Sequence, residues 1–205
     1  MQQKGELVVV RPDYFAMKSV RPGEYINPWG PGTAVASLPV FFLWDRFVSN
    51  FSEHPEDLWI AGKFTAALYV AGSVGLIYLT CAMFVRRGHA AIVALSYAFG
   101  TCVWSSSSQN LWQHGPMEFF LALGVLLFCR PGRGWLGTAG CAAALASATL
   151  CRPTAAMFVI AVGAHFLLFE RRALIPYALA GLPLGAALDR KSTRLNSSHL
   201  VISYA

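Results

Sequence analysis

The sequence predicts an all-α protein: a polytopic transmembrane helical bundle of about six spans, with an interfacial helix in the first outer loop. The chain is 56% hydrophobic and only 13% charged, whereas about a quarter of the residues in a soluble domain are charged. Apolar stretches of roughly 20 residues, the length that crosses a ~30 Å hydrocarbon core, recur along it. Clustered arginines interrupt these stretches at every other break.

The arginine clusters set the expected orientation. They are Arg86, Arg87, Arg130, Arg133, Arg171 and Arg172. Because cytoplasmic loops are enriched in Lys and Arg, we expect these breaks to face the cytoplasm. The two intervening polar breaks, 109–116 and 151–154, then share the opposite face. A histidine, amides, a tryptophan and an arginine brought together there indicate a site, since polar groups are costly to keep in a membrane.

The predicted spans alternate in direction. They are 58–85, 90–106, 111–129, 135–151, 154–169 and 173–188. The break 130–134 contains proline and glycine, which predict a tight turn. The span 135–151 is dense in Gly, Ala, Ser and Cys, so we expect it to be a central packing helix. No internal repeat links the spans, which disfavours transporter folds built from repeated halves.

Residues 1–57 are expected to form a non-cytoplasmic loop, although no signal peptide pattern opens the chain. One solution is a transmembrane helix upstream of Met1. The other is that 33–44 itself spans, which leaves four basic residues of the N-terminal segment inside. We favour the first, because an apolar run of about 12 residues is typical of an interfacial segment.

The last 17 residues, 189–205, resemble a translated short-read sequencing adapter. We therefore expect this segment to be an artefact rather than native sequence and to form no part of the fold. It carries three of the 16 basic and one of the 10 acidic residues, so the remaining chain has a net charge of +4 rather than +6. Inward-facing loops account for that balance, and nucleic-acid binding is not needed to explain it.

Three segments carry a resemblance to a known family. Asn-Pro-Trp-Gly-Pro-Gly-Thr-Ala at 27–34, followed by Leu-Pro-Val-Phe-Phe at 38–42, resembles the first-loop motif of the GT-C membrane glycosyltransferases. Ser-Gln-Asn-Leu-Trp-Gln-His-Gly-Pro at 108–116 and Arg-Pro-Thr within 151–154 are similar to recurring elements of the bacterial members. Those members include enzymes of the protein O-mannosyltransferase and aminoarabinose transferase type. The resemblance covers about residues 5–188.

The resemblance implies a multi-pass protein of the bacterial inner membrane, within the cell envelope. It implies transfer of a sugar from a polyprenyl-phosphate carrier to a lipid, glycan or protein acceptor on the non-cytoplasmic face. The family's catalytic carboxylate lies just after the first span, which we expect upstream of Met1. Asp13 and Glu24 lie in the corresponding loop but match no motif. We therefore expect this chain to be an internal, truncated fragment of the enzyme that is inactive by itself.

Arg152 and His114 are the main candidate substrate-binding residues. A guanidinium binds phosphate oxygens in a bidentate fork, which suits the departing lipid phosphate. The alternative for Arg152 is a side chain that extends along the apolar surface to water. His114 could bind phosphate, orient sugar hydroxyls or relay a proton. Its alternative is a residue that caps the start of a helix and positions Pro116 in the first turn.

Three further residues complete the candidate substrate-binding set. Gln113 adjoins His114, and Trp112 is either an interfacial aromatic residue or a stacking platform for sugar or prenyl chain. Lys63 lies about one turn inside its span, where extension to water is the favoured role and contact with the headgroup the second. Glu118 lies one turn deeper than His114, where a carboxylate is expensive unless paired. Either pairing with a distant residue or one missing from this chain, or catalysis, would explain it.

Other signals point to no additional chemistry. The five cysteines lie in or beside apolar spans without metal or disulfide spacing, so we expect packing residues, no metal site and no cofactor. Two other classes of function remain open: a transporter or flippase for a lipid-linked or anionic substrate, and a structural membrane subunit. The first of these would use the same histidine and arginine for recognition.

Overall fold

The computed structural model describes residues 17–18, 25–26, 31–51, 53–54 and 56–183, and apart from one short strand pair its regular structure is helical. The all-α prediction is therefore confirmed. The sequence did not predict the antiparallel pair formed by two two-residue strands, β1 (Met17–Lys18) and β2 (Tyr25–Ile26). The adapter-like segment 189–205, Asp13 and Glu24 lie outside the described residues.

The helices follow the predicted order closely. They are α2 (Gly32–Phe47), α3 (Asp57–Ala82), α4 (Arg87–Gly100), α5 (His114–Cys129), α6 (Trp135–Cys151) and α7 (Ala156–Phe169), and three short helical segments η1 (Val103–Ser107), η2 (Pro153–Ala155) and η3 (Arg171–Ala173) lie between or after them. A last helix covers 174–183. The bounds of α6 coincide with those predicted for the packing helix. A helix is also present where the interfacial helix was expected.

One predicted span is not a single continuous helix. The segment 90–106 is not a single helix, because α4 ends at Gly100 and a separate π-helix, η1, follows. The break lies at Thr101, whose backbone is extended. Its hydroxyl donates to the Tyr97 carbonyl at 2.7 Å and accepts the Val103 N–H at 3.3 Å. Such local hydrogen bonds from threonine compete with the helical pattern.

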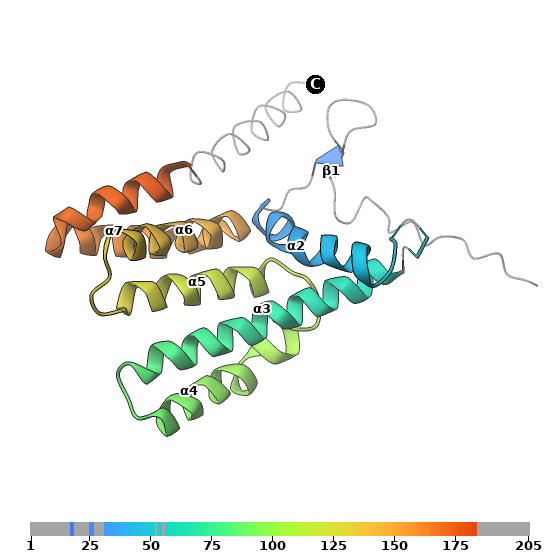
Figure 1. Cartoon of the computed structure of the whole chain (residues 1–205), viewed down its shortest axis with the longest axis horizontal. Helices are drawn as coiled ribbons and strands as arrows, with labels where there is room; N and C mark the ends of the chain where they lie inside the picture. The colour runs from blue at the N-terminus through green and yellow to red at the C-terminus, as the bar shows by residue number, and fades with distance from the viewer. Residues whose placement is uncertain (1–16, 19–24, 27–30, 52, 55, 184–205) are drawn as a thin grey trace, which may run out of the picture.

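The helices form an antiparallel array (Figure 1). The turns from α3 to α4, from α5 to α6 and from α7 to η3 lie together at one end of the bundle. These turns carry the clustered arginines, so the chain brings them to one end as the spacing predicted. The opposite end, next to α2, holds the connections from η1 to α5 and from α6 to α7. We call these the arginine-turn end and the α2 end.

Helix α6 lies at the centre of the packing, as its small residues predicted. Nine of its 17 residues are buried, and Leu145 and Cys141 join Phe166 of α7 and Tyr177 in the core. A Cβ on Gly124 of α5 would lie 2.6 Å from the Leu145 side chain. Glycine there lets α5 and α6 approach closely, as small residues do between membrane helices.

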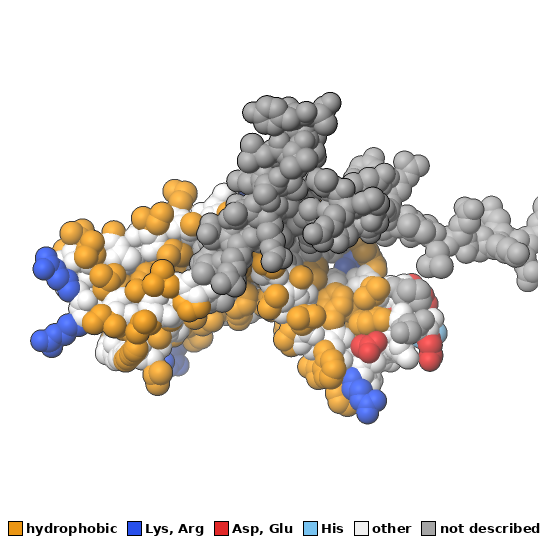
Figure 2. Space-filling view, turned by 90° about the horizontal axis from the view of Figure 1, so that it is seen from above, with side chains coloured by type: hydrophobic (Ala, Val, Ile, Leu, Met, Phe, Trp, Pro, Cys, Tyr) orange, Lys and Arg blue, Asp and Glu red, His pale blue; other side chains and the backbone are white. Residues whose placement is uncertain are grey.

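The outer surface of the bundle is strongly apolar. Many large hydrophobic side chains are more than half exposed, including Phe42, Ile92, Leu136, Ile160 and Leu179. Figure 2 shows hydrophobic side chains along the face in view, with charged side chains toward its two ends. Among the described helices, α3 alone has both the length and the apolar composition to cross a membrane; three other apolar helices are shorter.

Candidate functional site

The sequence Cys-Arg-Pro-Thr determines how α6 ends. Proline disfavours helical backbone in the residue before it, and Arg152 is accordingly extended. The Arg152 N–H still bonds to the Ala148 carbonyl at 2.9 Å, which closes the last turn of α6. Pro153 then opens η2, which continues directly into α7. Arg152 is thus fixed at the junction of two helices rather than carried on a free loop.

Arg152 contacts His114, the other main candidate residue. Arg152 Nη1 lies 2.8 Å from His114 Nδ1, and the pair is part-buried. A guanidinium can only donate, so Nδ1 must be the acceptor, and we assign the ring proton to Nε2. The Nε2–H and the remaining guanidinium donors are then available to a ligand. No side chain caps α5 among the described residues, so the capping role considered for His114 is not observed.

Close packing at two glycines joins α2 to the end of α6, and α5 to η1. A Cβ on Gly32, the first residue of α2, would lie 2.4 Å from the Cys151 backbone nitrogen. A Cβ on Gly115 would lie 3.4 Å from the Ser107 carbonyl oxygen. The described part of the 27–34 motif therefore packs against the 151–154 motif, which is bonded to the 108–116 motif. Three segments far apart in the chain converge at the α2 end.

In the described part of the chain, Arg152 has no acidic partner. Within the described ranges, no carboxylate lies within ion-pair distance of its guanidinium. Its observed partner is the neutral His114 ring nitrogen, which occupies one N–H donor of the guanidinium but does not neutralise its positive charge. Paired donors with an uncompensated positive charge favour a phosphate or another oxyanion. The arrangement can bind and orient such a group; the described residues at this point offer no carboxylate base.

The other three candidates lie outside this contact. Lys63 is exposed, and its Nζ lies 5.1 Å from the centre of the Trp59 ring. Trp112 is 49% exposed, as an interfacial aromatic residue would be. Gln113 is the residue before α5 and accepts the Met117 N–H through its carbonyl at 3.2 Å. Among the described residues, no side-chain hydrogen bond joins any of the three to Arg152.

Glu118 lies one turn into α5, and its carboxylate is hydrogen-bonded to a residue of another helical segment, η1. Ser107 Oγ donates to Glu118 Oε1 at 3.0 Å. Tyr97 lies beside the same carboxyl, and its hydroxyl is 3.4 Å from Ser73 Oγ. Glu118 Oε2 is buried and has no hydrogen-bond partner in the described part of the chain. We call Glu118, Ser107, Tyr97 and Ser73 the Glu118 cluster.

The sequence reasoning did not identify the three hydroxyl residues of the Glu118 cluster. They come from η1, α4 and α3, so no local spacing links them to Glu118. The signal that was present is the serine run 105–108 directly before the 109–116 break. The structure adds that three of these serines lie in the π-helix η1, and π-turns are frequent at functional sites.

Comparisons with protein-family models, curated proteins and solved structures each returned no match, so no family is assigned on that basis.

Proposed function

We propose that the chain is part of a polytopic membrane glycosyltransferase of the GT-C type. It would use a polyprenyl-phosphate-linked sugar as donor and act on the non-cytoplasmic face of the bacterial inner membrane. The observation that carries the proposal is the convergence of the three motif segments around the Arg152–His114 pair. This pair offers donors and positive charge to a lipid phosphate.

The membrane placement rests on the apolar surface and on the arginine turns. Exposed apolar area of this extent is atypical of soluble monomers and favours contact with lipid. The arginine-turn end would face the cytoplasm, which places the Arg152–His114 pair on the opposite side. We propose about six spans. Helix α5 is about 24 Å long at 1.5 Å per residue, so the adjoining turns would contribute to crossing a ~30 Å core.

The experiment is site mapping with a photoreactive polyprenyl phosphate, using the chain reconstituted in lipid nanodiscs. We expect crosslinked peptides from the α2 end, around His114 and Arg152, and loss of this labelling in Arg152→Gln. Arg87→Gln, which removes the same charge at an exposed position of the arginine-turn end, should retain it. Labelling that is confined to the arginine-turn end, or that Arg152→Gln leaves unchanged, would contradict the proposal.

A transporter for a lipid-linked or anionic substrate is the second candidate, and the Glu118 cluster favours it. A carboxylate inside a membrane protein commonly marks a substrate or ion pathway. A vesicle assay separates the two candidates. Movement of the labelled lipid across the bilayer that stops in Glu118→Gln supports transport. Binding at the α2 end without such movement supports the transferase.

A further inference from the structure

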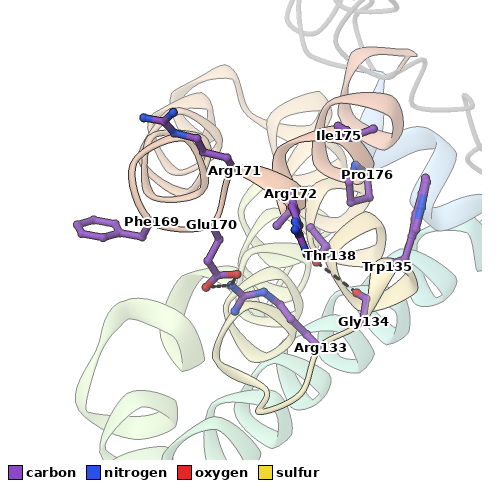
Figure 3. Close-up of a pocket in the computed structure, with 11 residues that line it drawn as sticks. Arg133, Gly134, Trp135, Thr138, Phe169, Glu170, Arg171, Arg172, Ile175 and Pro176 are labelled. Atoms are coloured by element: carbon purple, nitrogen blue, oxygen red, sulfur yellow. Dashed lines mark hydrogen bonds and ion pairs between the residues drawn. The ribbon is translucent and has the colours of Figure 1, made fainter.

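A pocket with charged lining residues lies at the arginine-turn end. It is a cavity of about 720 Å³ between the turn that precedes α6 and the turn that follows α7 (Figure 3). Arg133, Trp135 and Thr138 contribute from one side, and Glu170 and Arg172 from the other. Helix α6 is 17 residues, about 25 Å, long. The pocket is therefore well separated from Arg152.

The cations of this pocket are in different electrostatic states. Arg133 Nη2 donates to both oxygens of Glu170 at 2.6 Å, so these two charges compensate each other. Arg172 is exposed and has no ion-pair partner among the described residues. Arg171 and Arg172 both line the pocket, and Figure 3 shows Arg172 near Thr138 over its middle and Arg171 farther out. Of the lining cations without an ion-pair partner among the described residues, Arg172 thus lies nearer the middle of the pocket.

Helix α6 adds a second feature that favours an anion. Its first residue, Trp135, lines the pocket. No side chain caps this helix start among the described residues. The first N–H groups of a helix are unsatisfied within the helix, and the macrodipole is positive there. Helix starts consequently bind phosphate groups, and here the helix start and the Arg172 guanidinium border one cavity.

The rim of the pocket is apolar and exposed. It includes three apolar side chains that are about half exposed or more: Trp135, Phe169 and Ile175. A free phosphate ion would gain nothing from these side chains, whereas a lipid would contact them with its acyl chains. Tryptophan is also enriched at the headgroup level of membranes. Basic pockets between helices at the cytoplasmic side are suited to anionic lipid headgroups.

We propose that this pocket binds the headgroup phosphate of an anionic phospholipid. Arg172 and the first N–H groups of α6 contact the phosphate, and the acyl chains pack along Trp135 and Ile175. Glu170 does not repel the phosphate strongly, because Arg133 neutralises it. The inference rests on the membrane placement proposed above. It does not depend on sugar transfer.

The test is lipid retention by the purified chain in mild detergent, measured by native mass spectrometry and as a shift in melting temperature. Phosphatidylglycerol, phosphatidylcholine and inorganic phosphate are the probes. We expect phosphatidylglycerol to bind more tightly than phosphatidylcholine. We expect Arg172→Gln to weaken phosphatidylglycerol binding about fivefold. Arg87→Gln is the matched control, since it removes an exposed arginine at the same end outside the pocket, and it should change binding less than twofold.

Three results would overturn the inference. The first is equal loss of binding in Arg172→Gln and Arg87→Gln, which would indicate a general effect of surface charge. The second is equal affinity for the two lipids in the unmodified chain. The third is stabilisation by inorganic phosphate that matches that by phosphatidylglycerol, which would indicate a site for free phosphate. The melting temperature of each unliganded variant verifies folding. Polyprenyl phosphate labelling at the α2 end tests the transferase proposal separately.

Discussion

Two arginines near opposite ends of α6 differ in what surrounds them. Arg133 has a side chain that is only 12% exposed, donates to both Glu170 oxygens and to the Phe128 carbonyl, and lies 4.9 Å from the Phe128 and Phe166 ring centres. Arg152 donates to a histidine nitrogen and meets no carboxylate in the described part of the chain.

The difference separates a structural arginine from a binding one. The charge of Arg133 is used within the fold, because an acid, a carbonyl and two aromatic rings compensate for its lost hydration. No carboxylate of the described residues compensates the charge of Arg152, so it is available to an external anion. The contact with His114 limits the orientations of its guanidinium. An arginine whose partners leave its charge uncompensated is therefore the better candidate for a phosphate site.

The largest effect on stability is expected from Arg133→Ala. It removes the hydrogen bonds to both Glu170 oxygens and to the Phe128 carbonyl and two cation–π contacts, so we expect a loss of about 2–3 kcal/mol. Glu170 is 45% exposed, which keeps the cost below that of a fully buried pair. Chemical unfolding in detergent measures it. Arg130→Ala, at an exposed position of the same turn, is the control and should change stability by less than about 0.5 kcal/mol; equal losses would refute the structural role of Arg133.

Arg152→Gln should affect binding rather than stability. We expect affinity for polyprenyl phosphate to fall by about 2 kcal/mol, the range for a hydrogen bond to a charged group. The unfolding free energy should change by less than about 0.5 kcal/mol. Ligand titration and unfolding of the same preparation give both numbers. A stability loss as large as that of Arg133→Ala would show that Arg152 has a structural role like that of Arg133, and would contradict the proposed difference between the two arginines.

Gly32→Ala tests whether the start of α2 shapes the Arg152 site. The added Cβ would meet the Cys151 and Leu150 backbone, so α2 must shift, at about 1–2 kcal/mol. Because Cys151 adjoins Arg152, polyprenyl phosphate binding should weaken as well. Gly75→Ala, where a Cβ meets nothing within 4 Å, should affect neither quantity. Unchanged binding in Gly32→Ala would show that α2 does not take part in the site.

Ser107→Ala should destabilise the fold by about 1 kcal/mol, because Glu118 Oε1 loses its donor in a buried setting. Ser105→Ala is the control, since its serine is exposed. Thermal unfolding of the two variants is the measurement. If they are equally stable, the hydrogen bond to Glu118 makes no measurable contribution to stability.

Lys63→Gln is expected to have the smallest effect. The exposed cation interacts with Trp59 at a distance typical of a weak cation–π contact, worth about 0.5–1 kcal/mol at exposed sites. Polyprenyl phosphate affinity should remain within twofold. A loss of affinity comparable to that of Arg152→Gln would return Lys63 to the candidate site.

The sequence was most informative where a single helix carries the signal. The breaks at 130–134 and 151–154 predicted the bounds of α6, and its small residues predicted its central position. The contacts between segments could not be predicted, because they depend on tertiary packing. His114 and Arg152 are 38 residues apart, and the Glu118 cluster draws on four segments. The break at Thr101 was missed because the apolar pattern continues past it while one hydroxyl redirects the backbone.

The central claim is that the uncompensated charge of Arg152 binds a lipid phosphate. The most direct measurement is the ratio of the dissociation constants of polyprenyl phosphate and polyprenol, which differ in the phosphate alone, for the chain in nanodiscs. We predict that the chain binds polyprenyl phosphate at least about tenfold more tightly, and that Arg152→Gln abolishes this preference. Equal affinity for the two lipids, or a preference that survives in Arg152→Gln, would contradict the account.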